Sequence, residues 1–305
     1  MRTGRVLAVD VGGTKLAAGV VTSNGEVLAE AKTPTGAPSE GDAEALFARL
    51  ERLCRDVLSD AAVAVDGVGV GCGGPMRFPE GVVSPLFIPA WRGFPLRERL
   101  TRAFGHACVV DNDAKAMALG EWWLGAGRGK KNLLGIVVST GMGGGLVVDG
   151  RLLHGAHGHA GHVGHVNVQP GGPECSCGAR GCAGAFASGT GLSRRYREAM
   201  GAQKSAAQIA DLARSGDALA SKLYREAATA LGRAIASVEA LCDLELVVIG
   251  GSIGMHAWDL LEAPLAEELR STARFEFTRD LPVSRSALGE RAGLLGAAAL
   301  ALGAE

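Results

Sequence analysis

"VDVGGTKLAAGVV", residues 9–21 of this 305-residue chain, has the pattern of a strand, a glycine-rich turn and a second strand. "VSTGMGGGLVVDG", residues 138–150, repeats that pattern. Successive backbone N–H groups in such turns can bind phosphate. Two turns of this kind facing each other could grip a polyphosphate.

The remaining periodicity indicates that strands and helices alternate along the chain. Further β-branched runs stand at "VDGVGVGC", "ACVVDND", "LLGIVVST" and "ELVVIGG". Helical spacing of apolar residues marks residues 42–59, 112–124, 205–240, 257–270 and 291–302. Because the strand set recurs after about residue 130, we expect two α/β lobes.

Composition narrows the functional class. Hydrophobic residues make up 47% of the chain and the formal net charge is −1. Bulk charge therefore gives no indication of nucleic acid or a membrane surface. The start resembles no signal peptide, and no apolar run is long enough to span a bilayer. We expect a soluble, cytoplasmic protein that acts on a small molecule.

The first turn has the residue types of a phosphate site. Gly12 and Gly13 would let backbone approach an anion closely, and Thr14 and Lys15 add a hydroxyl and a charge. Asp10 would repel phosphate, but it can act through Mg²⁺ and water. A plain glycine hairpin is the alternative interpretation.

The seven cysteines fall into two groups. Cys54, Cys72, Cys108 and Cys242 are scattered among apolar residues and are expected to be small buried side chains. A cluster forms the other group, at Cys175, Cys177 and Cys182. Such a cluster in a cytosolic protein is more typical of a metal site than of disulfides.

Six segments, which follow one another along the chain in the order usual for the family, resemble the ROK family of sugar kinases. That family belongs to the actin/hexokinase-like ATPases. The two glycine turns resemble its phosphate loops, and "VVIGGSIG" resembles its adenosine loop. The family's catalytic, zinc and closing-helix segments are similar to "DNDAKAMALGE", "GHVNVQPGGPECSCGARGC" and "RAGLLGAAALA". The resemblance covers nearly the whole chain.

The resemblance implies a two-lobed actin-like ATPase (ribonuclease H-like) α/β fold with a structural zinc site. One lobe would comprise residues 1–118 and 291–305. Residues 119–290 would form the other lobe, with the zinc segment and a surface for homodimerisation. ATP-Mg²⁺ is expected in the cleft, held by Asp10, Gly12, Gly13, Thr14, Lys15, Thr140, Gly141, Gly143, Gly250, Gly251 and Gly254.

The resemblance assigns Asp113 the role of general base toward the acceptor hydroxyl. It assigns Asn112, with Gly74, to substrate binding. An Asp beside the acceptor would orient the hydroxyl and take its proton during phosphoryl transfer. Asp113 could instead be only a helix N-cap. Lys115 stands where the family commonly has Asn, as a peripheral change or as an added charge near the site.

The pattern H-x9-C-x-C-x4-C, from His165 to Cys182, reproduces the family's zinc ligands. One His and the three clustered cysteines complete a tetrahedral shell with no open position, which is typical of structural zinc. The resemblance implies that the second ring nitrogen of His165 contacts a sugar hydroxyl. Zinc would then shape the acceptor pocket without taking part in the chemistry.

Three residues depart from the family pattern. His162 and Gly184 stand where sugar-contacting Glu residues are usual, and Phe87 replaces an Asn. A hydrogen bond to a charged group contributes about 1.5–3 kcal/mol. Losing two carboxylates would therefore cost roughly 3–6 kcal/mol, or about 10²- to 10⁴-fold in affinity for the usual sugar.

These departures predict transfer to a primary hydroxyl, the 6-OH equivalent, of a modified hexose, an amino sugar (kanosamine-like) or a sugar-like cyclitol. An ordinary glucokinase with compensating contacts, a non-catalytic ROK sugar-binding protein and a polyphosphate-dependent kinase stay open. A ROK repressor is not expected, because the nine residues before Asp10 leave no room for a helix-turn-helix. His154, His157 and His159 are expected to be loop residues near the pocket mouth.

Overall fold

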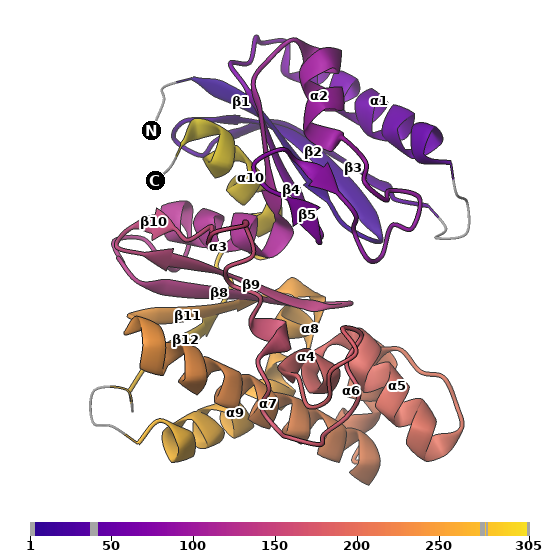
Figure 1. The fold of residues 1–305 in the computed structure, drawn as a ribbon, viewed down its shortest axis with the longest axis vertical. Coiled ribbons are helices and arrows are strands. Elements are labelled where there is room, and N and C mark those ends of the chain that lie inside the picture. Colours follow the sequence, from indigo (N-terminus) through magenta and orange to yellow (C-terminus); the bar gives the residue numbers. More distant parts are fainter. Residues whose placement is uncertain (1–3, 37–41, 275–277, 279, 304–305) are drawn as a thin grey trace. The chain divides into compact units, whose positions relative to one another are not determined.

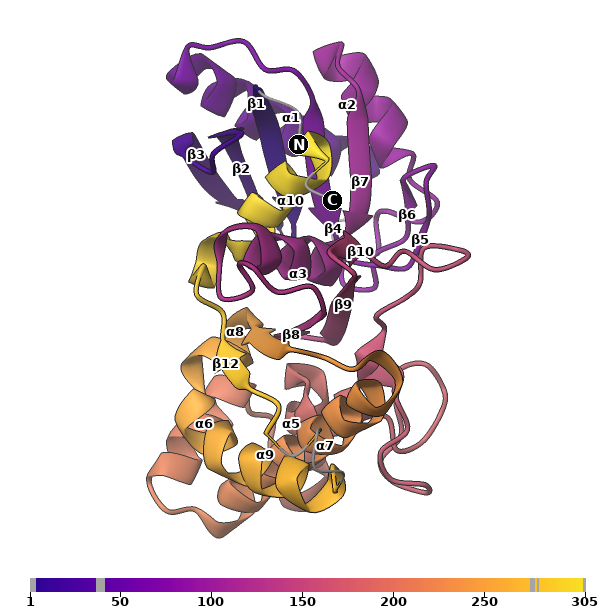
Figure 2. The same cartoon turned by 90° about the vertical axis from the view of Figure 1, so that its left-hand side faces the viewer.

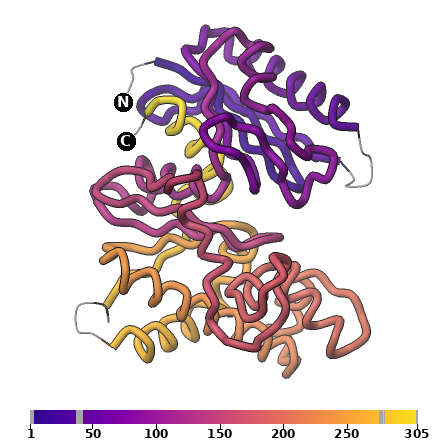
Figure 3. The backbone as a smooth tube through the Cα atoms, viewed as in Figure 1, coloured from indigo at the N-terminus to yellow at the C-terminus, as the bar shows by residue number. Residues whose placement is uncertain are grey.

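The computed structural model describes residues 4–36, 42–274, 278 and 280–303. Its contacts divide the chain into two compact units. Unit 1 comprises Met1–Gly129, Gly150–Ala160 and Glu290–Glu305, and unit 2 comprises Lys130–Asp149 and Gly161–Gly289. The trace in Figure 3 shows how the C-terminal segment returns to the fold of the N-terminal residues in unit 1.

Unit 1 is built on a five-stranded sheet in the order β3-β2-β1-β4-β7. β1 pairs antiparallel with β2 and parallel with β4, and β4 pairs parallel with β7. The strands are β1 (Arg5–Val11), β2 (Lys15–Thr22), β3 (Val27–Pro34), β4 (Val68–Cys72) and β7 (Cys108–Asn112). Parallel pairing brings the carboxyl ends of β1, β4 and β7 to one edge of the sheet.

Two pairs of helices cover the two faces of this sheet (Figures 1 and 2). α1 and α2 pack on one face, and α3 and α10 pack on the other. The helices are α1 (Ala43–Ala61), α2 (Leu96–Phe104), α3 (Asp113–Leu124) and α10 (Ala292–Leu302). Short strands β5 (Met76–Arg77), β6 (Val82–Val83) and β10 (Arg151–Leu152) lie in the connections.

Glycines bring α10 very close to its neighbours. A Cβ on Gly69 of β4 would lie 1.8 Å from the Ala297 carbonyl oxygen, and one on Gly296 would lie 1.7 Å from that of Ala116. Larger side chains at either position would separate the backbones. This packing keeps all of α3 in unit 1, whereas the lobe boundary expected at residue 118 falls inside that helix.

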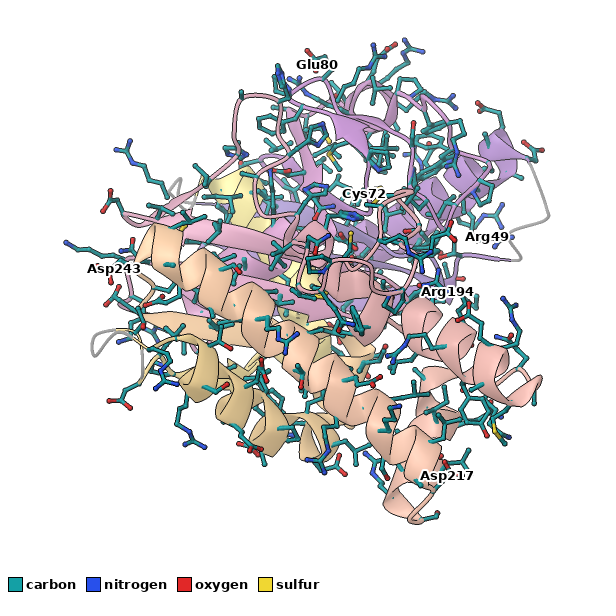
Figure 4. All side chains as sticks on the ribbon, turned by 60° about the horizontal axis from the view of Figure 1, so that its bottom comes forward. Arg49, Cys72, Glu80, Arg194, Asp217 and Asp243 are labelled. Carbon is teal, nitrogen blue, oxygen red and sulfur yellow. The ribbon has the colours of Figure 1, made fainter. Side chains whose placement is uncertain are left out.

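Unit 2 has strands in the order β9-β8-β11-β12, with the helices α7 and α9 packed together beside them. Its strands are β8 (Leu133–Val138), β9 (Met142–Val148), β11 (Leu246–Gly250) and β12 (Val283–Arg285). Its α-helices are α4 (Ala183–Ala187), α5 (Gly189–Met200), α6 (Ala206–Arg214), α7 (Ala218–Cys242), α8 (Gly251–His256) and α9 (Trp258–Thr272). Asp217 and Asp243 mark the two ends of α7 in Figure 4. Two single turns, η1 (Val163–His165) and η2 (Gly289–Arg291), complete the secondary structure that the described residues contain.

The predicted strands are confirmed, and the long helix predicted over 205–240 is wrong in one respect. It divides into α6 and α7, because Gly216 has a φ of +90° and Asp217 caps the second helix by accepting the N–H of Ala220. β3, α2 and α5 were not predicted. β3 is an edge strand whose residues alternate between half-buried and exposed, so its apolar signal is weak. Among the described residues, no helix is both long and apolar enough to cross a membrane.

Candidate active site

The end of β7 and the start of α3 place Asn112 and Asp113 side by side. Asn112, not Asp113, is the N-cap: its Oδ1 accepts the N–H of Ala114 at 3.0 Å. Asp113 is the first helical residue, and its Oδ1 accepts the same N–H at 2.9 Å. Its Oδ2 points toward Gly73, 4.0 Å from where a Cβ on that residue would lie. Burial raises the pKa of the Asp113 carboxyl. A partly desolvated carboxylate with a raised pKa is a better proton acceptor than an exposed one.

Asp10 is a second carboxyl at the same sheet edge. Burial first, and then repulsion from Asp113, raise its pKa to about 6, while Lys15 and Lys32 oppose the rise. Gly293 of α10 lies against it, because a Cβ there would be 2.7 Å from Asp10 Oδ2. Sequence reasoning missed Gly293, although the glycine is visible in "RAGLLGAAALA".

The first glycine turn joins β1 and β2. The Gly12 N–H donates to the Lys15 carbonyl at 3.0 Å, and the Thr35 hydroxyl donates to the Gly12 carbonyl at 2.7 Å. The turn is thus held by its own residues and by the segment that follows β3. Lys15 Nζ lies 3.8 Å from Glu290 Oε2, and both side chains are exposed. That weak ion pair leaves the Lys15 ammonium accessible to a phosphate.

Phe87 and Gly74 lie beside different parts of this edge. A Cβ on Gly13 would meet Phe87 Cβ at 2.6 Å, so Phe87 packs against the first glycine turn and is 40% exposed. A Cβ on Gly74 would lie 3.4 Å from Asn112 Nδ2. Unit 1 therefore brings together the predicted base, the first glycine turn and three of the predicted acceptor residues, Asn112, Phe87 and Gly74.

The second glycine turn and the adenosine-loop segment are neighbours within unit 2. The Ser139 N–H donates to the Gly141 carbonyl at 2.9 Å, and the Ser139 and Ser252 hydroxyls lie 2.9 Å apart. A Cβ on Gly251, whose φ is +83°, would lie 2.5 Å from the Val138 carbonyl oxygen. The predicted nucleotide residues Thr140, Gly141, Gly143, Gly250, Gly251 and Gly254 all belong to these two segments.

The four predicted metal ligands come together in unit 2. One ligand atom from each of His165, Cys175, Cys177 and Cys182 lies within 4.8 Å of the other three. Cys175 Sγ is 3.6 Å from His165 Nδ1, and Cys177 Sγ is 3.8 Å from Cys182 Sγ. Three thiolates and one imidazole suit a tetrahedral soft-metal site such as zinc. The cluster uses His165 Nδ1, which leaves Nε2 on the other side of the ring.

The loop that carries the thiols is held from outside. Arg194 of α5, labelled in Figure 4, donates to the carbonyl of Glu174, next to Cys175. Arg233 of α7 lies 3.4 Å from the carbonyl oxygen of Val168. These contacts fix the loop to two helices of unit 2.

His162 and Gly184 lie beside the metal ligand. The rings of His162 and His165 are nearly parallel, with centroids 6.3 Å apart. A Cβ on Gly184 would lie 3.1 Å from the carbonyl oxygen of Gly164. The three predicted acceptor contacts of unit 2 are thus neighbours around one turn, η1.

His154, His157 and His159, which precede these two along the chain, have separate environments. His154 Nδ1 lies 2.9 Å from Asp111 Oδ2, so His154 is bound to β7, the strand that ends just before the predicted base. His157 and His159 are exposed. Sequence reasoning missed Asp111 and the His154 contact, because the two residues are 43 positions apart.

Known proteins with related sequences cover nearly the whole chain. The profile of the ROK family matches residues 6–304. A glucokinase of Thermotoga maritima is 36% identical, over 97% of this chain and 96% of its own. An N-acetylmannosamine kinase of Yersinia pseudotuberculosis is 35% identical, over 97% of each chain.

A solved structure extends the likeness to three dimensions. The ROK family glucokinase of Streptomyces griseus, in complex with glucose and AMPPNP, is 32% identical. It superposes with a TM-score of 0.80 over 98% of this chain and 99% of its own. Sequence and fold agree over both units, and the chain therefore belongs to the ROK family, as one of its sugar kinases.

Proposed function

We propose that this kinase transfers the γ-phosphoryl group of ATP to a primary hydroxyl of a modified hexose, an amino sugar or a sugar-like cyclitol. The observation that carries the proposal is the pair His162 and Gly184 beside His165, where the family pattern has two carboxylates. Asp113 would take the proton of the 6-OH equivalent, and the altered pair would contact another part of the acceptor.

The base assignment follows from the surroundings of Asp113. Phosphoryl transfer needs little covalent help from the protein, so the carboxylate mainly orients the hydroxyl and accepts its proton. Burial raises the pKa of Asp113, which moves it toward the operating pH and strengthens it as a base. Asn112 adds an amide beside it, suited to a second hydroxyl of the acceptor.

The phosphate side combines backbone and charge. Glycine turns at Gly12–Gly13 and Gly141–Gly143 can offer N–H groups to the phosphates. Asp10 would hold Mg²⁺ through water, and Mg²⁺ would supply the charge that neutralises the transferring phosphoryl group. Burial first, and then repulsion from Asp113, raise the pKa of Asp10, so a cation at this edge would relieve an existing repulsion.

The metal cluster would hold zinc as a structural ion. Its four ligands leave no open position for a water or substrate, so its part is to fix His165 and the η1 turn. With Nδ1 toward the thiols, His165 would present Nε2 to the acceptor. Zinc thereby shapes the acceptor side without entering the reaction.

The acceptor argument depends on what His162 and Gly184 can no longer do. A carboxylate accepts two sugar hydroxyl protons strongly, whereas a neutral imidazole accepts one and donates one. Gly184 offers only space and backbone. An acceptor with an added amino group or a ring substituent fits this side better than glucose does. The related N-acetylmannosamine kinase supports a modified hexose, and the related glucokinases support the alternative of an ordinary hexose.

The test is an acceptor panel with ATP and Mg²⁺, measured as ADP release. It would contain glucose, mannose, fructose, N-acetylhexosamines, 3-amino-3-deoxyglucose and a C7 cyclitol, with the Asp113→Asn variant as the blank. We expect kcat/KM to be highest for an amino sugar or cyclitol. A strong preference for glucose would contradict the acceptor proposal and leave the kinase assignment intact. Turnover that is seen only when polyphosphate replaces ATP would contradict the assignment of ATP as the phosphoryl donor.

A further inference from the structure

A buried ion pair lies next to the proposed base. The side chains of Lys115 and Asp111 have no exposed surface, and Lys115 Nζ is 3.4 Å from Asp111 Oδ1. Burial lowers the pKa of Lys115, and the nearby Asp111 carboxylate opposes that shift. Taking two charges out of water is costly, and apolar side chains of similar volume often stabilise a core as well. Stability alone therefore does not account for this pair.

The Lys115 ammonium has an acceptor for each of its three protons. Besides Asp111 Oδ1, it lies 2.8 Å from the carbonyl oxygen of Gly158 and 3.4 Å from that of His154. It also lies 5.7 Å from the centroid of the Phe78 ring. One side chain on α3 thus holds the connection 154–158 and approaches the loop after β5.

Asp111 extends the network to the site itself. Its Oδ1 accepts the N–H of Asn112 at 2.7 Å, which fixes the peptide just before the proposed base. Its Oδ2 lies 2.9 Å from His154 Nδ1, and the His154 ring stacks on Phe78 with centroids 4.5 Å apart. The carboxylate is held from two sides, by an ammonium and by an imidazole.

We propose that Lys115 is a positioning residue for phosphoryl transfer: through Asp111 and the 154–158 connection, its ammonium fixes the orientation of Asn112 and Asp113 toward the acceptor hydroxyl. The proposal rests on Asp113 being the base. It concerns geometry, because Lys115 is closed off from any substrate by its own burial. Small displacements of a catalytic group are enough to matter, since a shift of about 1 Å can cost about 10²-fold in rate.

The test compares Lys115→Met with the double variant Asp111→Asn/Lys115→Met. Methionine keeps an unbranched chain that is one atom shorter, and it removes the charge and the donors. In the single variant Asp111 stays buried without its ammonium, whereas the double variant removes both charges. For each protein, kcat, the KM values for ATP and acceptor, and Tm are measured on the full chain.

We expect kcat of Lys115→Met to fall about 10²-fold, with KM for ATP within about 2-fold of the wild type. In the double variant we expect Tm to recover toward the wild type while kcat stays low, because the carbonyls of Gly158 and His154 still lack their donor. Leu261→Ala is the control for lost stability. It removes a fully buried side chain from the core of unit 2, so it should lower Tm without changing kcat.

A double variant that regains both Tm and kcat would overturn the proposal, since Lys115 would then only neutralise Asp111. So would a folded Lys115→Met protein with kcat near the wild type. If neither Lys115 variant folds, His154→Gln decides the question: its ring is partly exposed, and losing its contact with Asp111 should lower kcat about 3-fold at unchanged KM for ATP. No change in kcat there would contradict the proposal. A fully active Asp113→Asn protein would instead show that Asp113 is not the general base. That outcome would contradict the proposed function and is distinguishable from a failure of the Lys115 proposal.

Discussion

The hairpins β1–β2 and β8–β9 have the same arrangement of strand, glycine turn and strand, but one carries a carboxyl at its turn and the other carries neutral groups. In unit 1 the turn follows Asp10, a half-buried carboxyl whose pKa is raised to about 6 by burial and then by Asp113. In unit 2 the corresponding strand end carries Ser139, whose hydroxyl contacts that of Ser252. One hairpin offers a carboxyl beside its glycines, and the other offers neutral hydroxyl and backbone groups.

This difference shows how two copies of one motif can take different parts in a reaction. The carboxyls of Asp10 and Asp113 belong to unit 1, where the proposed reaction needs a metal ion and a proton acceptor. Unit 2 contributes neutral glycine segments and a separate cluster of thiols. If the comparison is correct, charge changes in unit 1 should alter the chemical step, whereas changes in unit 2 should alter binding and local stability.

The largest effect is expected from Asp113→Asn. Removing a general base typically costs about 10²–10⁴-fold in kcat. The fold should persist, because the amide oxygen can still accept the Ala114 N–H. Nucleotide binding, measured by calorimetry, should stay close to the wild type. Ser139→Ala in the other hairpin is the matched control, with kcat changed only a few-fold. Near-normal turnover of Asp113→Asn would break the assignment of chemistry to unit 1.

The next largest effect is expected from Cys177→Ser, which tests the separate cluster of unit 2. A weaker ligand in a closed four-ligand site should lower metal content from about one ion per chain to near zero. Inductively coupled plasma analysis of the purified protein measures this directly. Cys242→Ser, at a cysteine outside the cluster, should retain the metal. Full retention by Cys177→Ser would contradict the zinc proposal.

A smaller effect is expected on stability from Asp10→Asn. The folded pKa of about 6 lies above the unfolded value of 3.8, so the unfolded chain releases this proton first as pH rises. The Asp10 carboxyl therefore destabilises the fold progressively between pH 3.8 and 6, by about 3 kcal/mol above that window. Asp10→Asn should recover part of this at pH 7.5 and almost none at pH 4, by urea unfolding without Mg²⁺.

A carboxylate of unit 2 supplies the control of opposite sign. The N–H groups of Asn132 and Lys131 lower the pKa of Glu245, so its contribution is present at neutral pH and lost as pH falls. Glu245→Gln should therefore destabilise the protein more at pH 7.5 than at pH 4. Equal effects of Asp10→Asn at both pH values would show that its carboxyl is not disfavoured in the fold.

Features encoded in short segments could be predicted from the sequence. The two glycine hairpins, the strand before Asp113 and the four-residue metal cluster each combine residue types within a few positions, or repeat a family pattern. Their physical causes are local: turn conformation, β-branched runs and ligand spacing. The helix break at Gly216 is also local, but one positive φ in a long helical pattern gives little signal.

Features that depend on tertiary packing could not be predicted. Lys115, Asp111 and His154 meet only because β7, α3 and the 154–158 connection pack together. Gly293 matters because α10 returns across the chain to Asp10. His154 is 43 positions from Asp111, and Gly293 is near the opposite end of the sequence from Asp10, so no residue type alone indicates these contacts.

The smallest effect is expected from restoring carboxylates on the acceptor side of unit 2. His162→Glu with Gly184→Glu should raise kcat/KM for glucose about 10-fold, which is about 1.4 kcal/mol. This is less than two full hydrogen bonds to charged groups, because the new Cβ at position 184 would lie 3.1 Å from the Gly164 carbonyl oxygen. The η1 turn must yield by a few tenths of an ångström, which also moves His165.

The single variants separate the two contributions. Gly184→Ala measures the steric cost alone. His162→Glu alone should give most of the gain in kcat/KM, since the side chain of His162 is already exposed. Unchanged glucose turnover in a double variant that keeps its metal would mean that these positions do not contact the acceptor, and the comparison would then leave unit 2 with nucleotide binding only.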